Sequence, residues 1–141
     1  MNAYKYLPHT ADVKFRASGK TLNEAFKNAA YALTDVITNH KKIKSTVKKT
    51  IKITSENKEA LLYDFLEQFL ILVDSKNFLL NKIIILKIEE VKKGFKLTAK
   101  IAGDNHPKKY KINMQIKAVT YQEMFIKKQK GKFILQVVLD I

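Results

Sequence analysis

Two short stretches, Tyr6-Leu-Pro-His-Thr-Ala-Asp12-Val13 and Leu139-Asp140-Ile141, decide the fold expected for this chain. The first places His9 and Asp12 at the start of the first predicted strand, and the second places Asp140 and Ile141 at the end of the last. If the fold brings both chain ends together, three or more oxygens converge, which favours a hard cation such as Ca²⁺ or Mg²⁺. Spacing alone leaves another interpretation open, in which Asp12 is a turn residue or cap and Asp140 is solvated.

Two amphipathic helices are predicted downstream of the first strand, 12–17. Thr21 caps the first helix and Glu24 completes a capping box, with small apolar residues recurring at i, i+3 and i+4. Ser55 is the expected cap of the second helix, 57–74. Its apolar residues cover more than half the circumference, which predicts burial on two sides, or one core contact plus a partner.

The remaining apolar segments are predicted to be strands. The stretch 47–54 alternates weakly among lysines and predicts a half-exposed edge strand. A hairpin is expected over 82–90 and 95–102, followed by a long strand over 110–121 that bends and continues. The final strand, 133–139, is apolar on both faces and should be central. The predicted fold class is α+β: two helices packed on a mainly antiparallel β-sheet, in a single domain (1–141) with adjacent termini.

Net charge, cysteine content and the lack of long apolar runs limit the functions that this chain could have. The 141 residues carry a net charge of +14, with Arg16 the only arginine, and such a basic chain suggests polyanionic partners. There is no cysteine, so disulfides and thiolate metal sites are excluded. No signal-peptide pattern or membrane-spanning apolar run is present, so we expect a soluble cytoplasmic protein without membrane contact.

No complete catalytic motif is present. A phosphate-cradling G-x-x-x-x-G-K-[ST] loop and a G-x-S-x-G elbow are both missing, so no catalytic residue is assigned. His9 either hydrogen-bonds a ligating carboxylate or bonds the backbone at the strand entry. His40 and His106 fall in polar loops and are expected to be solvated. Lys117 stands in an apolar strand, where it pairs with Asp12 or Asp140, faces a partner, or lies at an edge.

Four blocks together resemble the archease family. They are Tyr6-Leu-Pro-His-Thr-Ala-Asp12, Leu61-Leu-Tyr-Asp-Phe-Leu-Glu-Gln-Phe69, Ile116-Lys-Ala-Val-Thr-Tyr121 and Val138-Leu-Asp-Ile141. The blocks occur in the family's order and span nearly the whole chain.

The resemblance implies a protein cofactor, not an enzyme, that activates the RtcB-type tRNA-splicing RNA ligase. It implies promotion of ligase guanylylation and multiple turnover, and a widening of nucleotide use from GTP to ATP, dGTP and ITP. A divalent cation, Ca²⁺, would be held by Asp12, Asp140 and Ile141, and Lys117 matches a functional lysine. Gln122 stands where many members carry histidine, which argues against a role needing an imidazole there.

The residues alone are also compatible with two other classes of function. A basic RNA-binding module would show steep salt dependence and no dependence on Asp12, with RNA meeting the lysine-rich face or reached through the ligase. A small metal-dependent hydrolase would turn over alone, but the sequence offers no obvious base. The resemblance favours the ligase activator.

Overall fold

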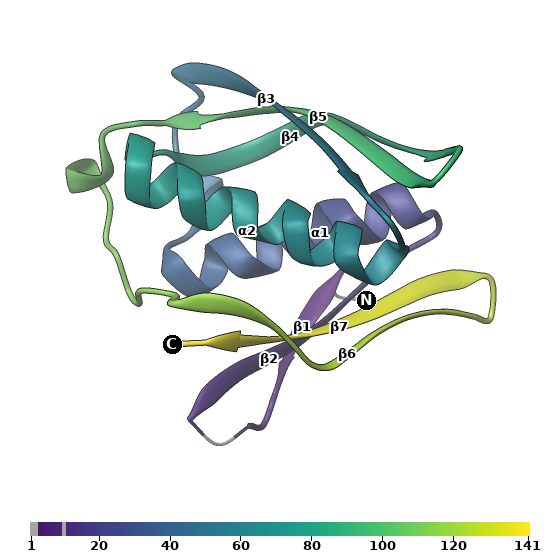
Figure 1. Cartoon of the computed structure of the whole chain (residues 1–141). Coiled ribbons are helices and arrows are strands. Elements are labelled where there is room, and N and C mark those ends of the chain that lie inside the picture. The colour runs from purple at the N-terminus through teal and green to yellow at the C-terminus, as the bar shows by residue number, and fades with distance from the viewer. Residues whose placement is uncertain (1–2, 10) are drawn as a thin grey trace.

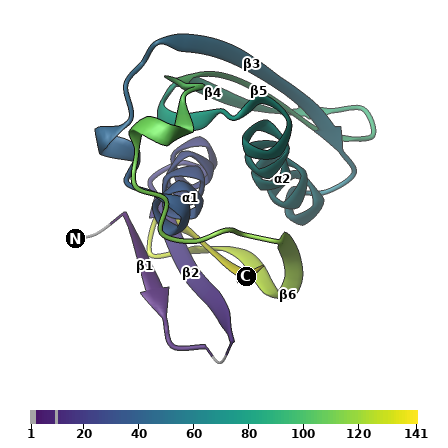
Figure 2. The same cartoon turned by 90° about the vertical axis from the view of Figure 1, so that its left-hand side faces the viewer.

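A computed structural model describes residues 3–9 and 11–141 of the chain, so Thr10 of the first motif lies outside the described residues. Two helices lie between two antiparallel sheets, as Figures 1 and 2 show. This arrangement confirms the predicted α+β class and the antiparallel pairing. The predicted adjacency of the termini is wrong: Ala3, the first described residue, accepts from the Ser18 amide at one end of β2, whereas Ile141 follows the Asp12–Asp140 pair at the other end. One sheet has the order β1-β2-β7-β6 and the other β3-β5-β4. The elements are β1 (Tyr4–Leu7), β2 (Asp12–Gly19), α1 (Leu22–Ile37), η1 (His40–Lys42), β3 (Val47–Ser55), α2 (Lys58–Lys76), β4 (Leu79–Val91), β5 (Gly94–Asp104), η2 (Pro107–Lys109), β6 (Ala118–Gln129) and β7 (Lys132–Asp140).

Helix α1 begins as predicted. Thr21 Oγ1 accepts a hydrogen bond from the Glu24 amide at 3.1 Å, and Glu24 Oε2 accepts one from the Lys20 amide at 3.2 Å. Both bonds satisfy amides at the helix entrance that have no partner inside the helix. The buried face carries Ala25 and Ala29, whose small side chains let the helix approach β2 closely.

Helix α2 packs against both sheets, which confirms the prediction of two-sided burial from its wide apolar surface (Figure 2). Phe65 is fully buried there and packs on Phe26 of α1, with ring centroids 6.0 Å apart. The predicted cap was wrong. Asn57 caps the helix by accepting from the Ala60 amide at 2.8 Å, whereas Ser55 ends β3 and donates to Asp64 at 2.6 Å.

Three strand predictions were confirmed by the sheet order. β3 is an edge strand, β4 and β5 form the hairpin, and β7 lies between β2 and β6. The bend in the sixth strand is also real: its pairing with β7 shifts between Thr120 and Phe125, and Glu123 has a positive φ of 53°. Such a bulge re-aims the side chains of the bent strand.

Two strand predictions need correction. The segment 110–117 is irregular, so β6 starts only at Ala118. Its backbone bonds the end of α1 instead of a strand: the Asn113 amide donates to Ile37 O at 2.7 Å, and Thr38 Oγ1 donates to Lys111 O at 2.8 Å. The short strand β1 was not predicted. In the part of the chain that the structure describes, no helix is long and apolar enough to cross a membrane.

Candidate functional site

The pairing of β2 with β7 brings the start of β2 beside the last residues of the chain. Asp12 lies directly opposite Asp140, and the register continues from Val13 opposite Leu139 to the far end of β2. Opposed residues of an antiparallel pair project from the same face of the sheet, with Cβ atoms about 5 Å apart. The two aspartates predicted from sequence are therefore neighbours. We call this place, with Ile141, the carboxylate edge.

His9 lies against the carboxylate edge. Its Nδ1 is 3.3 Å from Asp12 Oδ2, and its Nε2 is 3.0 Å from Glu123 Oε2. The Nδ1 atom is buried and makes no hydrogen bond within the described part of the chain. His9 therefore contacts two carboxylates, with its hydrogen bond going to Glu123 and not to Asp12.

Glu123 is the residue that sequence reasoning missed. The β6 bulge turns it toward His9, and Lys14 Nζ contacts its other oxygen at 3.1 Å. The hydrogen bond from His9, reinforced by Lys14, lowers the pKa of the Glu123 carboxyl below its ordinary value. The buried Gln136 side chain donates to the Glu123 carbonyl at 2.8 Å and so holds the bulge. A glutamine inside the apolar final strand was the sequence signal available for this contact.

Lys117 borders the same edge through its backbone. Its amide donates to Asp140 O at 2.8 Å, immediately before Ala118 pairs with Asp140. The Lys117 side chain is exposed. This placement fits a partner-facing lysine close to the two aspartates.

The other two histidines differ in their exposure to solvent. His106 is largely exposed, as expected. His40 is buried, so its predicted solvation was wrong: its Nδ1 lies 2.7 Å from Asp35 Oδ1, and its ring stacks on Tyr31 with centroids 4.4 Å apart. The turn η1 folds His40 back over α1, which the local polarity of the sequence did not indicate.

Asp104 organises the irregular segment beyond β5. Its side chain is fully buried and accepts hydrogen bonds from Tyr110 at 2.6 Å and Thr46 at 2.9 Å, with His106 Nδ1 at 3.1 Å. The Tyr110 hydrogen bond is the main reason that the pKa of this carboxyl lies well below its ordinary value. Two loops, the one before β3 and the one around η2, are thus tied to one carboxylate.

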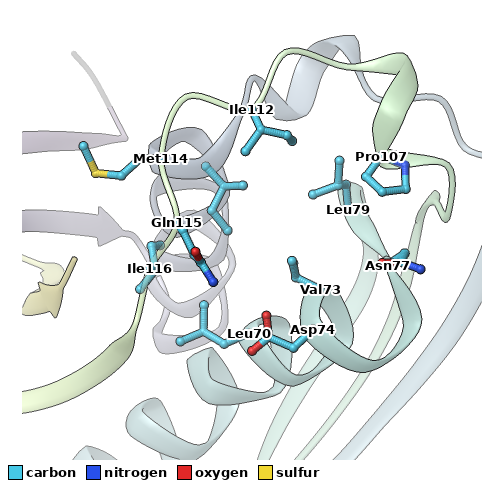
Figure 3. A pocket seen from close by; sticks show the side chains of 11 residues that line it. Leu70, Val73, Asp74, Asn77, Leu79, Pro107, Ile112, Met114, Gln115 and Ile116 are labelled. Carbon is cyan, nitrogen blue, oxygen red and sulfur yellow. The ribbon is translucent and has the colours of Figure 1, made fainter.

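An apolar pocket lies between the end of α2 and the segment 110–117 (Figure 3). It encloses about 240 Å³, and its lining includes Leu70, Val73, Ile112 and Met114. The polar members of the lining are Asp74, Asn77 and Gln115, which Figure 3 labels. Ile116, which also lines it, precedes Lys117, so the pocket adjoins the carboxylate edge along the chain.

The donors at the carboxylate edge are mainly oxygens. Asp12 and Asp140 are opposite one another, Ile141 adds main-chain oxygens, and His9 Nδ1 lies 3.3 Å from Asp12 Oδ2. Across the described residues, no cluster of three or more His, Cys, Asp or Glu side chains has metal-binding spacing. A cation here would therefore need oxygens of the main chain or chain end as well as the two aspartates, which is the set Asp12, Asp140 and Ile141.

The geometry defines a class: a small two-sheet α+β protein in which the start of β2 and the end of β7 form an acidic edge on a basic body. Residues 4–141 match a family model described as the Archease protein family (MTH1598/TM1083). Protein archease of Pyrococcus abyssi is 37% identical over 143 aligned positions covering 100% of both chains. Protein archease of Methanosarcina mazei is 35% identical, covering 98% of this chain and 95% of the relative. The chain belongs to the archease family.

Solved structures agree with this assignment. The solution structure of Methanobacterium thermoautotrophicum protein 1598 matches with a TM-score of 0.87 and 31% identity, covering 100% of both chains. The crystal structure of a Thermotoga maritima archease, described as a possible chaperone, has a TM-score of 0.65 at 19% identity, covering 97% of this chain and 96% of that one. The second likeness supports the fold alone.

The Asp104 contacts predict a specific loss of stability in acid. A carboxyl whose pKa is lowered on folding stabilises the protein above its ordinary pKa of about 4, and that stability is lost as pH falls toward the folded pKa. The difference in urea midpoint between the wild type and Asp104→Asn should therefore be large at neutral pH and shrink steadily below pH ~4.

Asp74→Asn is the matched control, because Asp74 is exposed. Its midpoint should stay close to the wild type throughout. A wild-type advantage over Asp104→Asn that is the same at neutral and strongly acidic pH would contradict the role given to the Asp104 charge.

Proposed function

We propose that this chain is a protein cofactor of an RtcB-type RNA ligase and acts by presenting the carboxylate edge to the ligase active site. The observation that carries the proposal is the pairing of Asp12 with Asp140 in a member of the archease family. The family resemblance implies promotion of ligase guanylylation and multiple turnover, and a wider use of NTPs. The partner is the ligase, with RNA reached through it, and no catalytic residue is assigned to this chain.

The donors of the carboxylate edge suit a divalent cation. Asp12, Asp140 and Ile141 would hold the ion, and their all-oxygen character favours Ca²⁺ over metals that select nitrogen or sulfur. The bound ion would supply positive charge that neutralises phosphate oxygens during guanylate transfer. His9 keeps Asp12 in place, and Glu123 in turn orients His9.

A net charge of +14 supports a second candidate, a basic RNA-binding module without ligase-specific activity. The two candidates differ at the carboxylate edge. Ligase activation requires Asp12 and Asp140, whereas binding through lysines does not.

Removing either aspartate tests the ligase proposal. With limiting ligase and 3′-phosphate RNA, Asp12→Ala and Asp140→Ala should reduce the reaction from many turnovers to a single one, because the cation loses half of its side-chain ligands. Both residues lie at the end of their strands, so thermal unfolding should remain close to the wild type.

Glu90→Ala is the control, because Glu90 is an exposed acid on β4 of the other sheet. It should support full turnover. Normal cycling of the ligase with the Asp140→Ala protein would rule out the carboxylate edge as the active element.

The apolar pocket beside the edge supports a position for the ligase contact. Ile112 and Met114 are 47% and 37% exposed, which is a large apolar area next to Lys117. A partner that covers this pocket would hold the carboxylate edge in its active site while Lys117 meets phosphate or carboxylate groups of the complex.

Met114→Glu tests this contact. A charge buried against the partner lacks a counter-ion, so ligase affinity should fall by about tenfold or more in pull-down titrations. Ile85→Glu is the matched control, since Ile85 is 58% exposed on β4, and it should bind like the wild type. Equal losses for both variants would remove the pocket from the interface.

A further inference from the structure

A second, polar pocket lies between the loop after α1 and the loop that contains η2. It encloses about 550 Å³, and its lining includes Lys42, Lys109, Lys111, Asn39 and Asn113. All five side chains are exposed. We infer that this basic pocket binds the phosphate groups of single-stranded RNA, independently of the carboxylate edge.

The two loops concentrate positive charge. Residues 38–46 and 104–113 together contain six lysines and one acidic residue, Asp104. Asp104 is fully buried and engaged by Tyr110 and Thr46, so its charge is not presented at the surface. The nearby Asp35 is engaged by His40. Charge of one sign lining a concave surface raises the local concentration of polyanions.

The pocket is held in shape before any ligand binds. Thr38 Oγ1 donates to Lys111 O at 2.8 Å, and the Lys44 amide donates to Tyr110 Oη at 3.1 Å, so both loops are joined. The last carbonyls of α1 would repel an anion, but Ile37 O already accepts the Asn113 amide at 2.7 Å. A preformed pocket loses less entropy when it binds.

The side-chain chemistry suits phosphate groups. Lysine binds phosphate as a point charge, and asparagine amides donate to phosphate oxygens. The lysines come from two loops, which suits successive phosphates along a strand. The segment 110–117 begins at this pocket and ends beside Asp140, so both sites share one connecting element.

Fluorescence anisotropy with a labelled oligouridine, without any ligase, tests the inference. The pocket variant Lys42→Gln/Lys109→Gln/Lys111→Gln should weaken binding by about tenfold or more and reduce the slope of log K against log salt by about 2, at ~0.7 per phosphate contact. The control Lys92→Gln/Lys93→Gln/Lys96→Gln, on exposed lysines of the β4–β5 hairpin, changes the net charge equally and should lower affinity by less than about threefold.

Equal losses in the two variants would overturn the site, because binding would then follow net charge alone. Absence of wild-type binding would overturn it as well. Polyglutamate serves as the probe for an acidic protein partner: an equal or greater loss of polyglutamate binding in the pocket variant would assign the pocket to a protein instead. Thermal unfolding of each variant checks that the fold is intact. The single variants Lys42→Gln, Lys109→Gln and Lys111→Gln should each lower the salt slope of RNA binding by ~0.7.

Discussion

The antiparallel pairing of β2 with β7 is the constraint on which the candidate site depends. It joins the first and last parts of the chain, and its register sets Asp12 against Asp140. A slip of one residue would turn every side chain of a strand to the opposite face. In β2, Phe15 and Ala17 are buried while Lys14 and Arg16 are not, so the packing of β2 specifies that register. The core thus determines the position of two polar residues at its margin.

A second polar anchor shapes the other surfaces. Asp104 holds Tyr110, and the segment after Tyr110 then runs along the end of α1 without joining a sheet. One side of that segment lines the apolar pocket and the other lines the basic pocket. The segment finishes at Lys117, beside the carboxylate edge. Three surfaces with different chemistry therefore lie along a short length of chain.

Periodicity predicted the helices and most strands, because their apolar faces repeat clearly and are buried as expected. It also predicted that β7 is central, because that strand is apolar on both faces, whereas the meeting of Asp12 and Asp140 was expected from the family resemblance. It could not predict Glu123, which reaches His9 through a bulge, or the burial of His40, which depends on a turn packing over α1. The failure over 110–117 has the same origin: long-range hydrogen bonds, absent from any local pattern, replaced strand pairing.

We propose that the start of β2 and the end of the chain form one cation pocket. Calorimetric titration of Ca²⁺ into the full chain and into Asp140→Asn tests this most directly. The wild type should show one binding site, weakened by about tenfold or more in the variant because the ion loses a charged ligand. Unchanged Ca²⁺ binding in Asp140→Asn, or no binding to the wild type, would contradict it.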